Sequence, residues 1–312
     1  MRNTMPDFAI VFSALRSGTT VLRLMLDAHS CISCPDEADY MFDFLSVTPD
    51  GRWQYDRAAL ARDRVFKMAE VSYPEGLDGL DALSGMVSQI HTSDQLPILI
   101  LHRGLKTAMA AHPGVKVIHM VRDPRDVAQS SIGMGWAGNV FFGVDHWLQT
   151  EGEWAERDDR FAPGQVLPVS YEALIANPDA ELARITAFLG FSYEPEMLNY
   201  AGGTTYSKPD IRLVEQWRHK LTPRDLGLVE AKVGGLMQSR GYQPSGHPPI
   251  VPTRWQQFRL MLQNRSVIWG TKFVRFGYVD PVLAGFSKRL HLPALGQRAR
   301  ARMDEKTIKY LK

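Results

Sequence analysis

The chain opens with an apolar run, a polar loop and a helix in direct succession, and this order limits the folds that it can adopt. Residues 8–12 form a short apolar run, the loop 16–20 reads Arg-Ser-Gly-Thr-Thr, and the apolar stretch 21–26 begins a helix. Unpaired N–H groups and the positive end of the helix dipole meet at such a helix start. Glycine permits close approach, and three hydroxyls add donors. The stretch predicts a phosphate-binding loop, with a serine- and threonine-rich turn as the alternative.

The loop lacks the lysine of the usual nucleotide-binding P-loop. Thr19 stands directly after Gly18, where that lysine belongs, and Ser13 stands where the motif begins with glycine. The P-loop lysine reaches the β- and γ-phosphates of a nucleoside triphosphate, so its absence argues against ATP or GTP. Arg16 instead precedes the glycine. A kinase with a degenerate P-loop is therefore the weaker alternative.

Short apolar runs alternate with helical stretches along most of the chain. Strands are predicted near 96–102, 115–121 and 165–171, and helices near 105–112, 124–135, 144–157 and 177–190, the last with Asn177 as its cap. Alternation of this kind predicts an α/β fold in three layers, with a central, mostly parallel sheet. Residues 41–95 are expected to form a helical insert. A linker rich in proline and glycine, 241–253, separates a domain over 1–245 from an extension over 246–312.

Arg122 ends a second predicted strand, and Ser130 follows eight residues later in the next helix. Ligands of open α/β sheets bind beyond the carboxyl ends of the strands. Arg122 is therefore placed to hold a second phosphate through its guanidinium fork, with Ser130 as a hydroxyl partner. The alternative is that the charged residues of 122–126 only pair with one another on a loop.

The positive charge of the chain is concentrated at its C-terminal end. From residue 251 onward there are 13 Lys/Arg and 3 Asp/Glu, a net charge of +10, whereas the whole chain carries +2. Such a segment is expected to meet something acidic: the protein's own body, an anionic membrane surface or a charged substrate. A contact between copies of the chain is a further alternative. No base-stacking platform accompanies it, so nucleic-acid binding is not expected.

No apolar run reaches the length of a membrane span and no secretory signal pattern begins the chain, which predicts a cytoplasmic protein, possibly peripheral at the membrane. The two cysteines, Cys31 and Cys34, lack the second pair or histidines of a zinc site and are expected to be incidental thiols. No carboxylate cluster suggests Mg²⁺, so no metal is expected.

Five segments, taken together, resemble the PAPS-dependent sulfotransferase family (PAPS is 3′-phosphoadenosine-5′-phosphosulfate). "ALRSGTT" is similar to that family's 5′-phosphosulfate loop, and "RDPRDVAQSS" to its 3′-phosphate motif. The stretch beginning "VSYEALIANP" and the closing segments "VEQWRHKL" and "MQSRGYQP" also resemble the family. The similarity extends over residues 6–244 and points to the bacterial and Golgi-type branch, which uses a glutamate base.

The resemblance implies a role for each matching position. Arg16 would stabilise the leaving phosphate, the positions at 17–20 would bind the 5′-phosphate, and Glu37 would be the general base, eight residues after His29. Asp36 is the alternative base if the loop is shifted by one residue. The residues implied to bind PAPS, and its product PAP, are Arg16, Ser17, Gly18, Thr19, Thr20, Arg122, Ser130 and Lys208.

The resemblance implies a sulfotransferase that moves a sulfuryl group from PAPS to a hydroxyl or amine of a small-molecule, glycan or lipid acceptor. Arg103, which follows the strand at 96–102, resembles an active-site lysine of related enzymes, or is a plain surface residue. A non-catalytic scaffold that binds PAP is a further alternative. The acceptor and the oligomeric state do not follow from the sequence.

Overall fold

The computed structural model describes residues 7–92, 94–200, 210–287 and 292–311, which fall into two compact units. The first unit comprises Met1–Val127, His146–Lys220 and Gly235–Gln243, and the second comprises Ala128–Asp145, Leu221–Gly234 and Pro244–Lys312. The second unit thus takes in the extension expected from the linker together with two earlier segments. The boundary at residue 245 stays a prediction.

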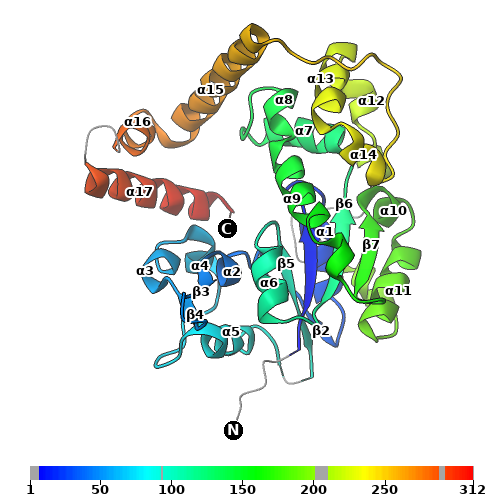
Figure 1. Cartoon of the computed structure of the whole chain (residues 1–312), viewed down its shortest axis with the longest axis vertical. Helices are drawn as coiled ribbons and strands as arrows, with labels where there is room; N and C mark the ends of the chain where they lie inside the picture. The colour runs from blue at the N-terminus through cyan, green and yellow to red at the C-terminus, as the bar shows by residue number, and fades with distance from the viewer. Residues whose placement is uncertain (1–6, 93, 201–209, 288–291, 312) are drawn as a thin grey trace. The chain divides into compact units, whose positions relative to one another are not determined.

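A five-stranded parallel sheet forms the centre of the first unit (Figure 1). Its strand order is β2-β5-β1-β6-β7. The bounds are β1 (Ala9–Ser13), β2 (Ile32–Ser33), β5 (Leu96–Leu101), β6 (Lys116–Val121) and β7 (Val166–Ser170). The central strand β1 pairs with β5 and β6, so its apolar run is buried on both faces. The predicted parallel α/β fold is confirmed.

Alternate residues of β1 point into two separate hydrophobic layers. Ile10 and Phe12 pack with the insert helices and with Trp154, whereas Ala9 and Val11 pack beneath the opening helix. The first layer is covered by α2 (Tyr40–Asp43), α5 (Gly79–Val87), α6 (Leu105–Ala111) and α9 (Asp145–Ala155); the second by α1 (Thr19–Asp27), α10 (Tyr171–Ala176) and α11 (Pro178–Leu189). The sheet is therefore the middle of three layers.

The boundaries of α11 follow from its sequence with one exception. Pro178 occupies the first helical turn, acidic residues follow it, and Gly190 ends the helix at φ 100°. Asn177 precedes the helix, but its side chain forms no capping hydrogen bond. Asn177 is thus the N-cap residue that the sequence predicted, and proline at the first position with acids in the first turn supports the helix start without a side-chain cap.

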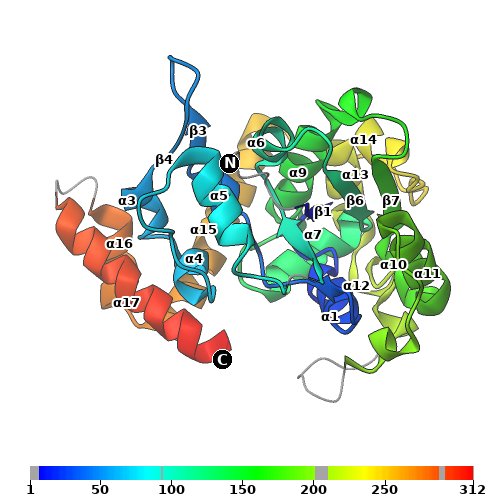
Figure 2. The ribbon, with the colours of Figure 1, turned by 90° about the horizontal axis from the view of Figure 1, so that it is seen from below.

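The insert is less helical than its sequence suggests. Besides α3 (Arg57–Leu60) and α4 (Arg64–Met68), it contains an antiparallel hairpin of β3 (Leu45–Val47) and β4 (Trp53–Tyr55), which is seen clearly in Figure 2. The hairpin turns at Gly51, whose φ of 80° suits glycine. Strands of three residues are too short to show a periodic pattern, which is why the sequence did not reveal them.

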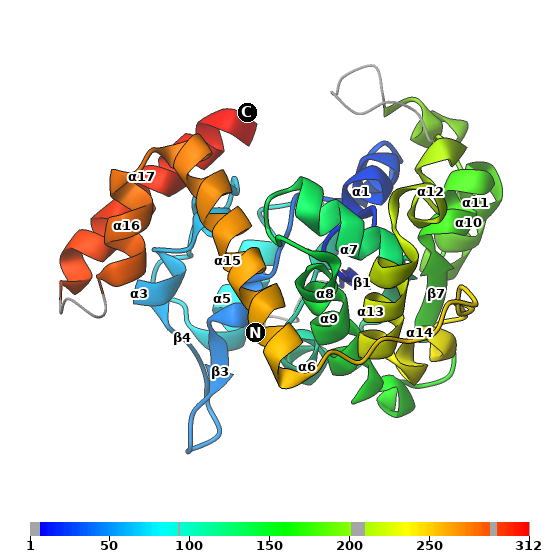
Figure 3. The same ribbon diagram turned by 90° about the horizontal axis from the view of Figure 1, so that it is seen from above.

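The second unit is helical. It contains the end of α7 (Pro124–Gly133), α8 (Val140–Gly143), α13 (Pro223–Val233), α15 (Arg254–Phe276), α16 (Val279–Phe286) and α17 (Pro293–Leu311). The long helix α15 begins at a capping box of Thr253 and Gln256, and α16 and α17 pack side by side (Figure 3). Among the described residues, no helix is both long and apolar enough to cross a bilayer.

The remaining short helices belong to the first unit. They are α12 (Trp217–Lys220), α14 (Gly235–Ser239) and the 3₁₀ turns η1 (Asp158–Arg160), η2 (Pro195–Leu198) and η4 (Ile211–Leu213).

Candidate active site

Polar residues gather where three neighbouring strands of the sheet end. The loop after β1, His102 after β5 and Arg122 after β6 follow strands that pair directly with one another. Carboxyl ends of parallel strands are where open α/β sheets bind ligands. This edge is therefore the candidate site.

The loop between β1 and α1 has the backbone shape of an anion cradle. Arg16 and Gly18 both adopt positive φ angles, 70° and 91°, and Gly18 stands directly before the first turn of α1. Ser17 is fully buried, and its hydroxyl has no hydrogen-bond partner among the described residues. A buried hydroxyl without a partner is costly unless a ligand satisfies it. The loop thus fits a bound anion at the helix N-terminus.

Tyr171 closes this loop from the side of β7. A Cβ atom added to Gly18 would lie 2.3 Å from the Tyr171 ring, so only glycine fits there without displacing the ring. The Arg122 guanidinium stacks on the same Tyr171 ring, 4.3 Å from its centroid. Tyr171 was not predicted as part of the site, although it lies in a segment that resembles the family.

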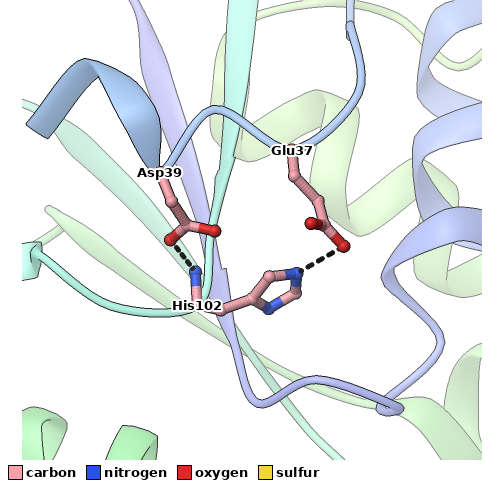
Figure 4. Close-up of side chains that lie close together, drawn as sticks. All are labelled: Glu37, Asp39 and His102. Atoms are coloured by element: carbon pink, nitrogen blue, oxygen red, sulfur yellow. Dashed lines mark hydrogen bonds and ion pairs between the residues drawn. The ribbon is translucent and has the colours of Figure 1, made fainter. Parts of the chain in front are cut away.

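Glu37 is held beside the end of β5. The backbone of the residue after it, Ala38, donates a hydrogen bond to the Ile100 carbonyl at 2.9 Å. The Glu37 carboxylate then lies 3.4 Å from Nε2 of His102, as Figure 4 shows. Its side chain is 44% exposed, whereas that of His102 is 3% exposed. Glu37 therefore presents a carboxylate to solvent with a buried imidazole behind it.

The other nitrogen of His102 fixes the protonation of the pair. Nδ1 lies 2.6 Å from the carbonyl oxygen of Ser13, which only accepts hydrogen bonds, so Nδ1 must carry a proton. A neutral His102 would then direct the lone pair of Nε2 at the Glu37 carboxylate. At 3.4 Å the contact is an ion pair rather than a hydrogen bond, and it is attractive when Nε2 of His102 is protonated.

Both pKa values reflect this contact. Interaction with His102 outweighs partial burial and lowers the pKa of Glu37 below its ordinary value. Burial opposes the charged imidazole, but Glu37, Asp39 and the Ser13 carbonyl outweigh it and raise the pKa of His102. The favoured state is an imidazolium beside a carboxylate. His102 was missed by the sequence reasoning; the signal was a histidine directly after a buried strand.

Asp39 holds the turn after β5 in place. One of its carboxylate oxygens accepts the backbone N–H groups of His102 at 2.8 Å and Arg103 at 3.1 Å. Burial raises the pKa of Asp39. Glu37, Asp39 and His102 offer ligand atoms within 4.8 Å of one another, a donor set that suits a divalent cation, although Asp39 already accepts two N–H groups.

Three residues that the sequence singled out are each held by a partner within the protein: Arg103, Asp36 and His29. Arg103 donates to the carboxylate of Asp43, at 3.0 and 3.1 Å from Nε. Asp36 lies 3.2 Å from Arg23 on α1 and its side chain is 80% exposed. His29 is buried, accepts the N–H of Cys31 at Nδ1, and lies 2.9 Å from the Ser192 carbonyl at Nε2.

Arg122 reaches back to the anion loop. Its Nη1 donates to the Arg16 carbonyl at 3.0 Å and its Nη2 to the Leu213 carbonyl at 3.1 Å, while Asp126 lies 3.6 Å away. The structure thus brings Arg122 and the loop together. Its role as a phosphate clamp stays a prediction, and a phosphate bound there would take over one of these donors.

The neighbouring charges pair as the alternative interpretation expected. Arg125 donates to Asp123 at 2.7 Å and stacks 3.7 Å from the Trp217 ring centroid. Ser130 lies on the part of α7 that belongs to the second unit, so its partnership with Arg122 stays a prediction. Lys208 lies outside the described residues.

The two thiols are separate from these groups. Cys31 is partly exposed and Cys34 is buried, and neither forms a disulfide. Burial raises the pKa of Cys34 and makes it a poor nucleophile.

The fold and site define an α/β protein with an anion loop and a carboxylate–imidazole pair at the same sheet edge. Comparison with known proteins agrees with this class. The model of the sulfotransferase family matches residues 9–195. The chain belongs to the sulfotransferase family, and the expectation of a PAPS-dependent sulfotransferase is confirmed at the level of the family.

Two curated relatives are named as protein-tyrosine sulfotransferases. A putative protein-tyrosine sulfotransferase of Caenorhabditis briggsae is 29% identical over 199 residues, covering 59% of this chain and 66% of the relative. Protein-tyrosine sulfotransferase A of Caenorhabditis elegans is 23% identical over 276 residues, covering 79% of this chain and 70% of the relative. The alignments thus span about two thirds of these relatives.

A solved structure shares the fold. The sulfotransferase domain from the curacin biosynthetic pathway superposes with a TM-score of 0.54 at 17% identity, covering 79% of this chain and all of that domain. The likeness shows the arrangement of the sheet and its helices.

Replacing Gly18 by alanine tests the closed loop. Alanine at positive φ costs about 1–2 kcal/mol, and displacing the Tyr171 ring adds about 1–3 kcal/mol. Gly164→Ala is the matched control, because Gly164 also has positive φ (79°) but has no atom within 4 Å of the added Cβ. Urea unfolding of both variants should show the larger loss of stability for Gly18→Ala. Equal losses would show that Tyr171 does not close the loop.

Proposed function

We propose that this chain transfers a sulfuryl group from PAPS to a hydroxyl, or amine, of its acceptor, with Glu37 as general base. One observation carries the proposal: the Glu37 carboxylate, backed by His102, stands at the same sheet edge as the loop that contains Arg16. A base and an anion loop at one edge are what in-line transfer from a phosphosulfate requires.

The donor is proposed to bind through the loop and the end of β6. Thr19, Thr20 and the first N–H groups of α1 would hold the 5′-phosphate, together with the buried hydroxyl of Ser17. Arg122 would hold the 3′-phosphate. Ser130 and Lys208 are proposed as further contacts on the family resemblance alone.

The proposed reaction is a single displacement at sulfur. The acceptor oxygen attacks the sulfur and forms an S–O bond, while the S–O bond to the 5′-phosphate breaks. The acceptor proton passes to the Glu37 carboxylate, and negative charge develops on the phosphate oxygen. Arg16, a permanent cation on the loop, would stabilise that charge. PAP and the sulfated acceptor are the products.

His102 is proposed as a positioning residue for this base. Its contact with Glu37 lowers the pKa of the carboxylate and fixes its direction. The Ser13 carbonyl and Asp39 in turn orient the imidazole and its backbone. Asp36 lacks such support, since its partner is Arg23 on the neighbouring helix. These contacts support Glu37 over Asp36 as the base.

The acceptor is proposed as a class only. The relatives' names point to protein tyrosine, a phenolic hydroxyl, and the sequence expectation of a small-molecule, glycan or lipid hydroxyl stands beside it. A panel of acceptors with radiolabelled PAPS, containing tyrosine peptides, glycans and lipids, separates them.

Calorimetry with PAP and with ATP tests the donor: tight ATP binding without PAP binding would overturn the proposal in favour of a kinase.

Glu37→Gln should slow sulfate transfer by about 10²–10⁴-fold, the usual contribution of a general base, because the amide keeps the shape of the side chain but cannot take the proton. PAP binding should be unchanged. The matched control is Asp36→Asn, which neutralises the adjacent acid. Transfer is measured with labelled PAPS and binding by calorimetry. If the Asp36 variant is the inactive one, the assignment of the base is wrong.

Arg16→Met should slow transfer by about 10²–10³-fold, the usual loss when one charge-stabilising donor is removed. Arg16→Lys keeps the cation and should recover part of the rate. PAP binding should weaken far less than the rate, since the new charge develops only in the transition state. Single-turnover kinetics measures the effect. Equal losses in binding and rate would assign Arg16 to ground-state binding instead.

The pH profile tests His102. Glu37 must be ionised to act, and its pKa is lowered by His102, so the rate should fall only below the ordinary glutamate range of about 4.3. In His102→Gln the pKa of Glu37 rises, and the acid limb of kcat should move to higher pH. The control His112→Gln removes a histidine that faces Asp7 instead. An unmoved limb in His102→Gln would show that His102 does not act on Glu37.

A further inference from the structure

The first half of α15 presents large apolar side chains to solvent. Among the described residues, 12 of the 17 exposed large hydrophobic side chains lie between residues 251 and 295, so the extension concentrates them. On α15, Trp255 is 66% exposed, Phe258 44% and Leu262 49%. Trp255 and Phe258 also stack on one another with ring centroids 5.6 Å apart.

These three side chains lie on one face of the helix. Their spacing of three and four residues, 255, 258 and 262, places them in a single stripe. The helix contacts the rest of its unit through other positions. The Leu260 carbonyl accepts a hydrogen bond from Asn139 at 2.8 Å, and the Asn264 side chain accepts the N–H of Gly138 at 2.6 Å. Packing of α15 within the unit therefore does not use the stripe.

Positive charge flanks the stripe. The helix contains five basic residues and no acidic residue: Arg254, Arg259, Arg265, Lys272 and Arg275. None of the five forms an ion pair with an acid in the described parts of the chain. The extension does pair cations elsewhere, since Arg302 and Lys306 both approach Asp280. Within the part of the chain that the structure describes, the cations of α15 are thus left without an acidic partner.

The exposed apolar stripe and the cations beside it together favour an anionic lipid surface over the other candidate partners. Helices that lie in a bilayer interface carry Trp, Phe and Leu on one face and Lys or Arg beside it. The tryptophan suits the headgroup level, and cations beside it are attracted to an anionic surface. A second copy of this chain would bring a second set of like charges to the same face, which opposes pairing.

We propose that α15 binds the surface of anionic membranes, lying flat with Trp255, Phe258 and Leu262 at the acyl boundary and Arg259 and Arg265 at the headgroups. This inference concerns a surface separate from the candidate active site and does not depend on the proposed reaction.

Vesicle flotation of the full chain tests the proposal. The chain should bind vesicles of phosphatidylcholine with 30% phosphatidylserine and should bind pure phosphatidylcholine vesicles at least tenfold more weakly. Trp255→Ala/Phe258→Ala/Leu262→Ala should reduce binding to the anionic vesicles at least tenfold. The control Val274→Ala removes an apolar side chain that is 89% exposed at another position of α15 and should bind as the wild type does.

A second vesicle-binding test changes the charge of α15. Arg259→Gln/Arg265→Gln should weaken binding to the anionic vesicles and reduce its salt dependence. Arg62→Gln/Lys67→Gln makes the same change in net charge on exposed positions of the other unit and should leave binding nearly unchanged. Circular dichroism and urea unfolding check that each variant is folded.

Three outcomes would overturn the proposal. The first is no partition of the folded wild-type chain to either vesicle, and the second is equal binding by the wild type and the apolar triple variant. The third is a wild-type dimer in light scattering that the triple variant converts to a monomer, with no vesicle binding. That result would assign the stripe to a contact between copies of the chain.

Discussion

The candidate site depends on one hydrogen bond, from Nδ1 of His102 to the carbonyl of Ser13. It joins the end of β5 to the end of β1, the two strands that deliver the imidazole and the anion loop. It also places a proton on Nδ1 of the imidazole, so that Nε2 faces the Glu37 carboxylate and the two groups form an ion pair when His102 is protonated. The carboxylate is consequently positioned by a group that is itself buried.

Features formed by consecutive residues could be predicted from the sequence. Continuous apolar runs identified β1, β5 and β6, because strands buried on both faces need such runs. The loop before α1 was recognisable because its glycine, hydroxyls and helix start are consecutive. Glu37 was proposed as the base from the family resemblance. The hairpin of β3 and β4 was not predicted, because three-residue strands carry no periodic signal.

Contacts between distant segments could not be read from the sequence. His102 and Glu37 are 65 residues apart. The parallel pairing of β1 with β5 brings the loop beside the imidazole, and the backbone hydrogen bond from Ala38 to Ile100 brings the carboxylate to the same edge. The family resemblance pointed instead to Arg103, the residue after His102, as an active-site cation. In the structure the Arg103 guanidinium is paired with Asp43. The stripe on α15 is a similar case. Its aromatic residues were visible, but which of them face solvent depends on how the helix packs on residues 138 and 139.

The contact between Gly18 and Tyr171 has a consequence for how the protein can change. The two positions are 153 residues apart in the chain, yet they share one volume, since the ring fills the space that a side chain at position 18 would occupy. A larger residue at 18 is tolerated only with a smaller one at 171, and losing the ring also removes the surface on which Arg122 rests. Substitution at these three positions is therefore coupled, and any redesign of this loop has to treat them as a single unit.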